Sequence, residues 1–254
     1  MSTSLPTAVT ILAAGKGKRM GNPDLAKVLV PLAEQPLINH VLDRAVELGA
    51  ERIVVIVGHR AEDVQNVVRE HVHDARTVLQ AEQLGTGHAV LMTEHELSDR
   101  ERDILILSGD VPLITTDTLL SLLHHHHNTT AVATILTTVV DNPTGYGRIV
   151  RSADGAIARI VEQKDATEDE RTIREINSGV YVVRSSALFS ALHRVRNDNT
   201  QGEFYLTDIV DILLKDGAEV ATYVCDDPAE VHGINTPDDL RAAELLYTQR
   251  QESL

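Results

Sequence analysis

Short apolar runs alternate with amphipathic segments along the first 140 residues. The apolar runs are short and predict buried strands, whereas the segments between them repeat apolar residues at helical spacing. The strands are expected at 8–12, 52–57, 78–79, 104–107 and 131–140, and the helices at 36–48, 61–70, 87–96 and 115–127. Because strands that alternate with helices are typical of a doubly wound sheet, we predict an α/β, Rossmann-like fold with a mostly parallel sheet.

The pattern changes after residue 141. Two short apolar runs flank the dipeptide Asp154-Gly155, which predicts a β-hairpin. Polar residues follow, and later segments return to the sheet, so we expect a small β-rich lobe inserted into the fold rather than a separate domain. The hairpin strands are 148–151 and 157–162, the polar stretch is 163–174, and the later elements are 176–183, 185–195, 205–215 and 219–224. A last helix should start after the N-cap Thr236 and run towards Arg250.

A basic, glycine-rich loop follows the first strand. Gly15, Gly17 and Gly21 are interspersed with cations, which are Lys16, Lys18, Arg19 and, further on, Lys27. Glycine lets the backbone approach a ligand and expose its N–H groups, and the cations supply the charge that a phosphate chain needs. The spacing Gly-x-Gly-x-x-x-Gly matches neither the dinucleotide-binding pattern nor the P-loop. On its own the loop fits either a phosphate site or a turn that uses glycine for its geometry.

The composition restricts the class of protein. A net charge of −15 over 254 residues argues against a general nucleic-acid surface, which needs a basic face. We find no run of ~18 apolar residues and no secretory signal, so we expect a cytoplasmic protein without a membrane span. The lone Cys225 is expected to be a small buried residue, and the run His124 to His127 a solvated helix end rather than a metal site.

Several motifs together resemble one enzyme family. They are 12–20, 27–29, 80–89, 109–113, 143–149, 161–167, 175–179 and 201–208. In this order they resemble the nucleotidyltransferases that join a sugar 1-phosphate to a nucleoside triphosphate. Within that family they are most similar to the uridyltransferase half of the bacterial bifunctional N-acetylglucosamine-1-phosphate uridyltransferases. The resemblance implies one nucleotidyltransferase domain over 1–254, with a nucleotide-binding half (1–140), a sugar-binding lobe that returns to the sheet (141–235) and a C-terminal helix (236–254).

The resemblance also implies the site residues. Arg19 and Lys27 would bind the triphosphate, and Asp110 would hold Mg²⁺ together with Asn235, so that Arg19, Lys27 and Asp110 form the catalytic set. From its position alone, after a strand and a glycine, Asp110 fits either a metal ligand or a turn aspartate. The nucleoside would be bound by Leu12, Ala13, Ala14, Gly15, Gln80 and Gly85, with Thr86 near the sugar, and the sugar by Gly147, Glu162 and Asn177; Ser108 and Gly109 would be further substrate-binding residues.

The implied reaction makes UDP-N-acetylglucosamine and pyrophosphate from UTP and N-acetylglucosamine 1-phosphate. The chain departs from the family at Lys18, Ala26 and Ser108, where threonine, proline and often tyrosine are usual, so another sugar or nucleotide is an alternative. A second alternative is a catalytically silent subunit that binds a nucleotide sugar. The family's trimeric acetyltransferase half is missing, which fits a truncated or a monofunctional enzyme, and we expect a monomer without acetyl-CoA chemistry.

Overall fold

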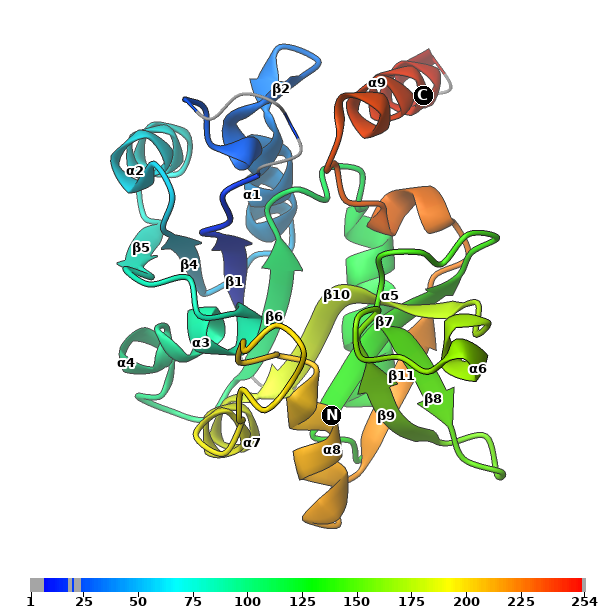
Figure 1. Cartoon of the computed structure of the whole chain (residues 1–254). Coiled ribbons are helices and arrows are strands. Elements are labelled where there is room, and N and C mark those ends of the chain that lie inside the picture. The colour runs from blue at the N-terminus through cyan, green and yellow to red at the C-terminus, as the bar shows by residue number, and fades with distance from the viewer. Residues whose placement is uncertain (1–6, 18–19, 21–23, 253–254) are drawn as a thin grey trace.

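The structure, a computed structural model, describes residues 7–17, 20 and 24–252 and is built on a nine-stranded sheet. The main order is β11-β7-β10-β6-β1-β4-β5, and the β8–β9 hairpin extends the sheet from β10 (Figure 1). Within the main order only β10 runs against its neighbours, so the prediction of a mostly parallel α/β sheet is confirmed. The strands are β1 (Thr7–Ala13), β4 (Arg52–Val57), β5 (Arg76–Leu79), β6 (Asp103–Ser108), β7 (Ala133–Val139), β8 (Arg148–Arg151), β9 (Ile157–Val161), β10 (Glu175–Arg184) and β11 (Val220–Val224).

Helices cover both faces of the sheet. One face packs against α1 (Leu37–Glu47), α2 (Ala61–His71) and α5 (Thr116–His127), and the other against α3 (Thr86–Leu91), α7 (Ser185–Leu192) and α8 (Asp208–Lys215). The remaining elements are a small hairpin of β2 (Pro31–Leu32) and β3 (Gln35–Pro36), the short helices η2 (Lys27–Leu29), α4 (Glu94–Leu97), α6 (Glu168–Arg171) and η3 (Pro228–Val231), and the C-terminal helix α9 (Pro237–Glu252). None of the helices in the described part of the chain is long and apolar enough to cross a membrane.

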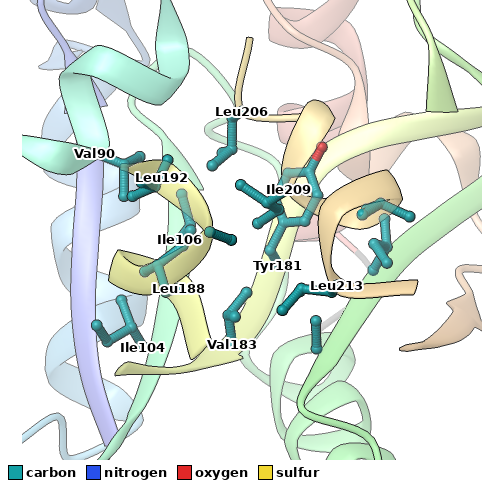
Figure 2. Packing of buried hydrophobic residues seen from close by; sticks show 14 of the residues in the cluster. Val90, Ile104, Ile106, Tyr181, Val183, Leu188, Leu192, Leu206, Ile209 and Leu213 are labelled. Carbon is teal, nitrogen blue, oxygen red and sulfur yellow. The ribbon is translucent and has the colours of Figure 1, made fainter. Parts of the chain in front are cut away.

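Strand β6 shows how the sequence produces two cores. Because side chains alternate across a strand, Ile104 and Ile106 enter one hydrophobic cluster while Leu105 and Leu107 enter the other. Figure 2 shows the first cluster, in which Leu188 and Leu192 of α7 lie beside Ile104 and Ile106, and Ile209 and Leu213 of α8 lie beside Tyr181 and Val183 of β10. This two-sided burial explains why the run 104–107 is wholly apolar in the sequence.

The inserted hairpin forms where the sequence predicts it. Strands β8 and β9 pair antiparallel, and Gly155 takes a φ of +87° in the turn between them. Arg148 pairs with Ile176 of β10, which joins the hairpin to the main sheet. The polar stretch after β9 is not purely irregular, because Thr167 and Glu170 form a capping box that starts the one-turn helix α6.

The predicted helix over 87–96 is instead divided into α3 and α4. Between them Thr93 is fully buried, and its hydroxyl donates a 2.7 Å hydrogen bond to the carbonyl of Val90. A threonine that bonds back to the preceding turn competes with the regular helical pattern, which accounts for the break.

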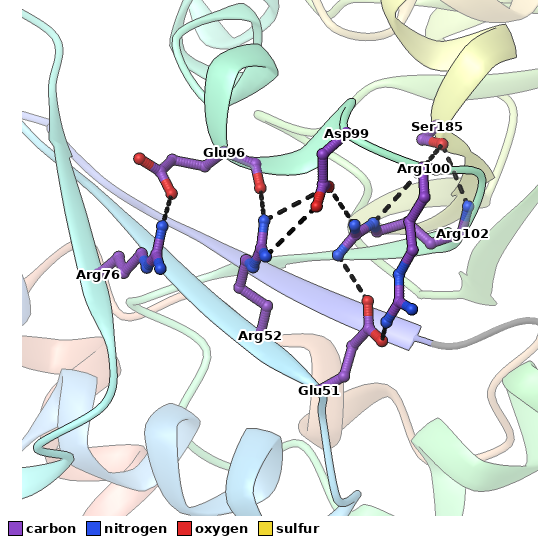
Figure 3. A network of polar contacts seen from close by, with 8 residues as sticks. All are labelled: Glu51, Arg52, Arg76, Glu96, Asp99, Arg100, Arg102 and Ser185. Carbon is purple, nitrogen blue, oxygen red and sulfur yellow. Dashed lines mark hydrogen bonds and ion pairs between the residues drawn. The ribbon is translucent and has the colours of Figure 1, made fainter.

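A network of charged residues ties the amino-terminal edge of the sheet together (Figure 3). The side chain of Arg102 is 1% exposed and pairs with Glu51 at 2.5 Å and with Asp99. Its backbone N–H donates to the hydroxyl of Ser185 at 3.2 Å, which attaches the start of α7. Arg102 therefore joins its own segment to Glu51 through the guanidinium and to Ser185 through the backbone, and these three parts lie far apart in the sequence.

A second buried charge lies at the same edge. Asp103 is 1% exposed and contacts two histidines, with His127 Nε2 at 2.9 Å from Oδ2 and His126 Nε2 at 3.4 Å from Oδ1. His126 also bonds Thr134 through Nδ1 at 2.8 Å. The prediction of a solvated histidine run is therefore wrong for His126, which is buried, whereas His127 contacts Asp103 and remains partly exposed.

Candidate active site

A cavity of about 510 Å³ opens at the carboxyl ends of the central parallel strands. Leu12 of β1 lies beside Ser108 of β6, and from these two neighbouring strands the chain continues in opposite directions along the strand order, from β1 to β4 and from β6 to β7. Such a switch point is where open α/β sheets bind ligands. The cavity is lined by Leu12, Ala13, Ala14, Gly15, Lys16, Lys27, Val28, Gln80, Gln83, Gly85, Thr86, Ala89, Ser108, Asp110 and Glu203.

Three polar side chains meet at one side of this cavity. The ammonium of Lys27 donates hydrogen bonds to Oδ2 of Asp110 and, at 3.1 Å, to Oδ1 of Asn235. The side chains of Lys27 and Asp110 are 15% and 18% exposed, so the pair lies mostly out of bulk water. These residues come from positions up to 208 apart along the chain, and the fold brings them together.

Asp110 and Asn235 are held by backbone contacts of their own segments. The N–H of Ile234 donates to the carbonyl of Asp110 at 2.9 Å, which fixes the two segments side by side. Nδ2 of Asn235 donates to the carbonyl of Gly233 at 3.0 Å, so that its oxygen is directed to Lys27. The carboxylate oxygen of Asp110 and the amide oxygen of Asn235 therefore face the same position, which the ammonium of Lys27 occupies.

The start of α9 anchors Asn235. The carboxylate of Asp239 accepts from the N–H groups of Asn235 and Thr236 at 2.9 and 2.8 Å, and Thr236 caps the helix by accepting from Asp239 N–H. Although burial raises the pKa of Asp239, these backbone hydrogen bonds and His232 hold it below its usual value overall. The N-cap predicted at Thr236 is confirmed.

The pair Asp110 and Asn235 fits a hard divalent cation. A carboxylate and an amide oxygen are donors of the kind that Mg²⁺ prefers, and Mg²⁺ needs only one or two from the protein. Both oxygens already reach the one cationic nitrogen of Lys27. Among the described residues no group of three His, Cys, Asp or Glu side chains could hold a metal, so an ion here needs further ligands from substrate and water.

Lys27 is held close to the glycine-rich loop. Gly17 has a φ of +57°, and a Cβ built on it would lie 2.5 Å from the Cβ of Lys27, so only glycine fits at this approach. Lys18 and Arg19, the latter expected in the catalytic set, lie outside the described residues.

Gln80 lies at the floor of the cavity and is 3% exposed. Its amide nitrogen donates to the carbonyl of Gly85 and contacts Nδ1 of His88, each at 3.0 Å. Its backbone carbonyl accepts from Gln83 Nε2, also at 3.0 Å. Gln80 is therefore fixed by its own loop and by α3.

The loop that carries Gly85 is braced by a distant segment. The N–H of Phe204 donates to the carbonyl of Leu84, and the N–H of Gly87 donates to the carbonyl of Phe204, each at 2.8 Å. The N–H of Leu206 donates to the hydroxyl of Thr86 at 3.0 Å. Gly85 has a φ of +115°, and a Cβ there would lie 2.5 Å from the carbonyl oxygen of Phe204. The loop depends on glycine at this point.

The residues expected at the sugar form a second group beside the cavity. Gly147 and Asn177 are joined by a 2.9 Å backbone hydrogen bond, and a Cβ on Gly147 would lie 3.5 Å from Oε1 of Glu162. Asn177 Oδ1 accepts from Gly179 N–H at 3.1 Å, and Gly179 in turn approaches Ser108 of the first cavity. The two groups are therefore contiguous.

Glu162 has a perturbed environment. Burial raises the pKa of its carboxyl, a hydrogen bond from Thr207 opposes this, and the carboxyl of Asp208 raises it further. Thr207 Oγ1 donates to Glu162 at 3.1 Å, and burial together with Asp211 raises the pKa of Asp208 to about 6. A carboxyl whose pKa is raised and which lies beside a hydroxyl suits hydrogen bonding to a neutral polyol.

The structure also places residues that the sequence did not single out. Gln83 and Glu203 line the main cavity, and Thr207 contacts Glu162. Both Gln83 and Glu203 lie inside the motifs 80–89 and 201–208, which was the available signal. Gly109 and Asn235 are not among the cavity's lining residues; Gly109 instead donates its N–H to the carbonyl of Leu12 at 2.9 Å.

Cys225 and the aromatic pair 204–205 behave as structural residues. Cys225 is 4% exposed, and burial raises the pKa of its thiol to about 11, which leaves the thiol protonated at neutral pH. Tyr205 is buried and Phe204 packs against the core.

Comparison with known proteins shows which family and which relatives the chain is similar to. The family described as nucleotidyl transferase matches residues 8–229. Proteins named bifunctional protein GlmU are similar to the chain: that of Exiguobacterium sibiricum is 49% identical over 240 residues, 94% of this chain and 53% of that protein. That of Geobacter metallireducens is 46% identical over 246 residues, 96% of this chain and 51% of that protein. The chain thus spans about half the length of these relatives.

The fold has a relative of known structure as well. The crystal structure of UDP-glucose pyrophosphorylase complexed with UDP-glucose matches with a TM-score of 0.74, covering 97% of this chain and 99% of that one. At 16% identity this likeness shows a shared fold alone. Because the family match takes in most of the chain, from β1 into the segment before α9, the chain belongs to the nucleotidyl transferase family.

Proposed function

We propose that the chain is a uridyltransferase that joins UTP and N-acetylglucosamine 1-phosphate to form UDP-N-acetylglucosamine and pyrophosphate. The observation that carries the proposal is the convergence of Lys27, Asp110 and Asn235 at a cavity whose floor is Gln80. The similarity to proteins named bifunctional protein GlmU over the length of this chain supports the choice of substrates.

The cavity suits a uridine nucleotide. Gln80 uses its amide nitrogen within the protein, which leaves its carbonyl oxygen to accept from the N3–H of uracil. The main-chain stretch Leu12 to Gly15 lines the same cavity and would contact the nucleoside, with Thr86 at its rim. Lys27 and Lys16 would meet the triphosphate, together with Arg19.

The second group suits the sugar. Glu162 and Asn177 can both accept hydrogen bonds from hydroxyl or amide groups, and Gly147 leaves room beside them. Their contiguity with Ser108 would place a sugar phosphate next to the nucleotide. Two reactants held side by side in this way gain much of their rate from orientation alone.

The chemistry is an in-line displacement at phosphorus. An oxygen of the sugar phosphate attacks the α-phosphorus of UTP, the bond from that phosphorus to the bridging oxygen of the β-phosphate breaks, and pyrophosphate leaves with the electron pair. Lys27 would neutralise charge on the triphosphate as it builds up. A Mg²⁺ ion bound by Asp110 and Asn235 would supply further charge stabilisation at the phosphates.

The test is pyrophosphate release from UTP and N-acetylglucosamine 1-phosphate in the presence of Mg²⁺. We expect rapid release that EDTA abolishes, and slower release with glucose 1-phosphate or with dTTP. Faster turnover of another pair would assign the chain to a different sugar or nucleotide. Binding of UDP-N-acetylglucosamine without turnover of any pair would overturn the proposal in favour of a silent binding subunit.

A further inference from the structure

His88 contacts the cavity only through Gln80. It lies on α3, is not among the residues that line the cavity, and its Nδ1 is 3.0 Å from the amide nitrogen of Gln80. The same nitrogen donates to the carbonyl of Gly85 at 3.0 Å. Both hydrogens of the amide thus have an acceptor inside the protein.

This arrangement determines the protonation of the imidazole. An amide nitrogen can only donate, so Nδ1 of His88 must be the acceptor, and the ring proton is placed on Nε2. The His88 ring is tilted by 39° to the ring of Phe204, with centroids 6.5 Å apart. The backbone N–H of Phe204 donates to the carbonyl of Leu84, so His88 packs against the segment that braces the loop.

The reverse orientation of the amide is unfavourable. If the Gln80 amide were turned over, its oxygen would oppose the carbonyl of Gly85, which can only accept, and His88 would have to move its ring proton from Nε2 to Nδ1. Gln80 is 3% exposed, so water cannot compensate the lost hydrogen bonds. The amide oxygen is therefore held on the side away from His88.

We propose that His88 is a positioning residue for base selection: it fixes the Gln80 amide so that its oxygen accepts from uracil N3–H and repels cytosine. Cytosine carries an unprotonated N3, which would face this oxygen with two acceptors opposed. The inference rests on the proposed function in one respect, namely that Gln80 meets the base. Discrimination of this kind comes from the repulsive pairing as much as from the attractive one.

The test compares two substitutions at His88. In His88→Phe the ring remains but the acceptor is lost, whereas in His88→Asn the side-chain oxygen restores an acceptor near the position of Nδ1. The same change at the exposed His95, His95→Phe, is the matched control. For each protein, the dissociation constants of UTP and CTP are measured by calorimetry with Mg²⁺ present, and their ratio is the readout.

We expect His88→Phe to reduce the preference for UTP over CTP about fivefold, as expected for one lost hydrogen bond, and His88→Asn to restore most of it. His95→Phe should keep the wild-type ratio. An unchanged ratio in His88→Phe overturns the inference, and so does equal loss in both His88 variants, since the acceptor would then be irrelevant. A folding defect weakens the binding of both nucleotides alike, so it cannot by itself produce the expected fall in the ratio.

The binding ratio also separates this inference from the proposed function. If the wild-type protein prefers UTP but releases no pyrophosphate with any sugar phosphate, the reaction fails while the role of His88 is still tested. If it releases pyrophosphate from UTP and CTP equally and binds both equally, the role of His88 is overturned while nucleotidyl transfer stands.

Discussion

The two edges of the central sheet both carry buried charge but use it differently. At the amino-terminal edge, Arg102 and Asp103 are each 1% exposed, and their partners Glu51, Asp99 and the histidines of α5 belong to the protein. At the carboxyl edge, Lys27 and Asp110 border a cavity of about 510 Å³. The first set connects segments of the chain, whereas the second set faces a space that a ligand can fill.

This comparison gives a criterion that separates charged residues that stabilise the fold from charged residues that act on a ligand. A fully buried charge that has only protein partners and borders no cavity contributes to folding, and its loss should appear in the free energy of unfolding. A charge that borders a cavity contributes little to folding and should affect turnover when it is removed. Substitutions at the two edges, among them the identical change Asp110→Asn and Asp103→Asn, test this distinction directly.

The largest effect is expected for Asp110→Asn, which removes one charge and keeps the shape. If Asp110 binds the metal ion, kcat for pyrophosphate release should fall about 10³-fold, while the melting temperature stays close to that of the wild type. Steady-state kinetics at saturating Mg²⁺ and differential scanning calorimetry measure the two quantities. Near-normal turnover would remove Asp110 from the mechanism.

Next in size is the effect of Lys27→Met. Loss of the ammonium should lower kcat/KM for UTP about 10²-fold, in the range seen when an electrostatic donor to a transition state is lost. The exposed Lys215, paired with Asp211 on α8, provides the control Lys215→Met, which should leave kcat/KM unchanged. A defect limited to the KM of the sugar phosphate would contradict the assignment of Lys27 to the triphosphate.

At the opposite edge, Arg102→Ala should destabilise the fold without impairing the site. We expect a loss of about 2 kcal/mol in the free energy of unfolding, because the guanidinium bonds Glu51 and Asp99 and its stem fills buried space. Urea unfolding followed by circular dichroism gives this value. The kcat of the folded fraction should remain that of the wild type, and a comparable drop in kcat would erase the proposed difference between the edges.

The smallest effect is expected for Asp103→Asn, the counterpart of Asp110→Asn. Burial raises the pKa of Asp103, but the hydrogen bonds and charges of His126 and His127 outweigh this and place the pKa below its ordinary value of 3.8. The carboxylate therefore stabilises the fold above about pH 4, and this contribution is lost as the pH falls through the lowered pKa.

We expect Asp103→Asn to lower the free energy of unfolding by about 1 kcal/mol at pH 7, with unchanged kcat. The difference between the two proteins should shrink in urea titrations below about pH 4. A difference that persists or grows with acidification would show that the carboxylate's charge is not what stabilises this edge.

The sequence predicts the parallel core well because its signals are local. The run 104–107 is apolar at every position, and such a run has few alternatives to a strand buried on both faces. The reversed direction of β10 has no such signal, since it depends on pairing with β6 and β7 over long separations. The break at Thr93 depends on one hydroxyl bonding back to Val90.

The contacts within the candidate site are likewise hard to predict from local sequence signals. The pairing of Asp110 with Asn235 came from the resemblance, because no local rule connects residues 125 positions apart. The contact of Gln80 with His88 spans only eight positions, yet it depends on the turn that Gly85 makes between them. The burial of His126 could not be predicted, since its partner Asp103 lies on another element.

The first turn of α9 has a practical consequence for protein engineering. Asp239 holds the backbone of Asn235 and Thr236, so the amide oxygen that reaches Lys27 depends on a residue inside the helix. A shortened chain or a fusion partner joined before Asp239 would leave Asn235 without this anchor. Splice points for chimeras, tags or biosensor inserts therefore belong beyond this turn, on the exposed face of α9.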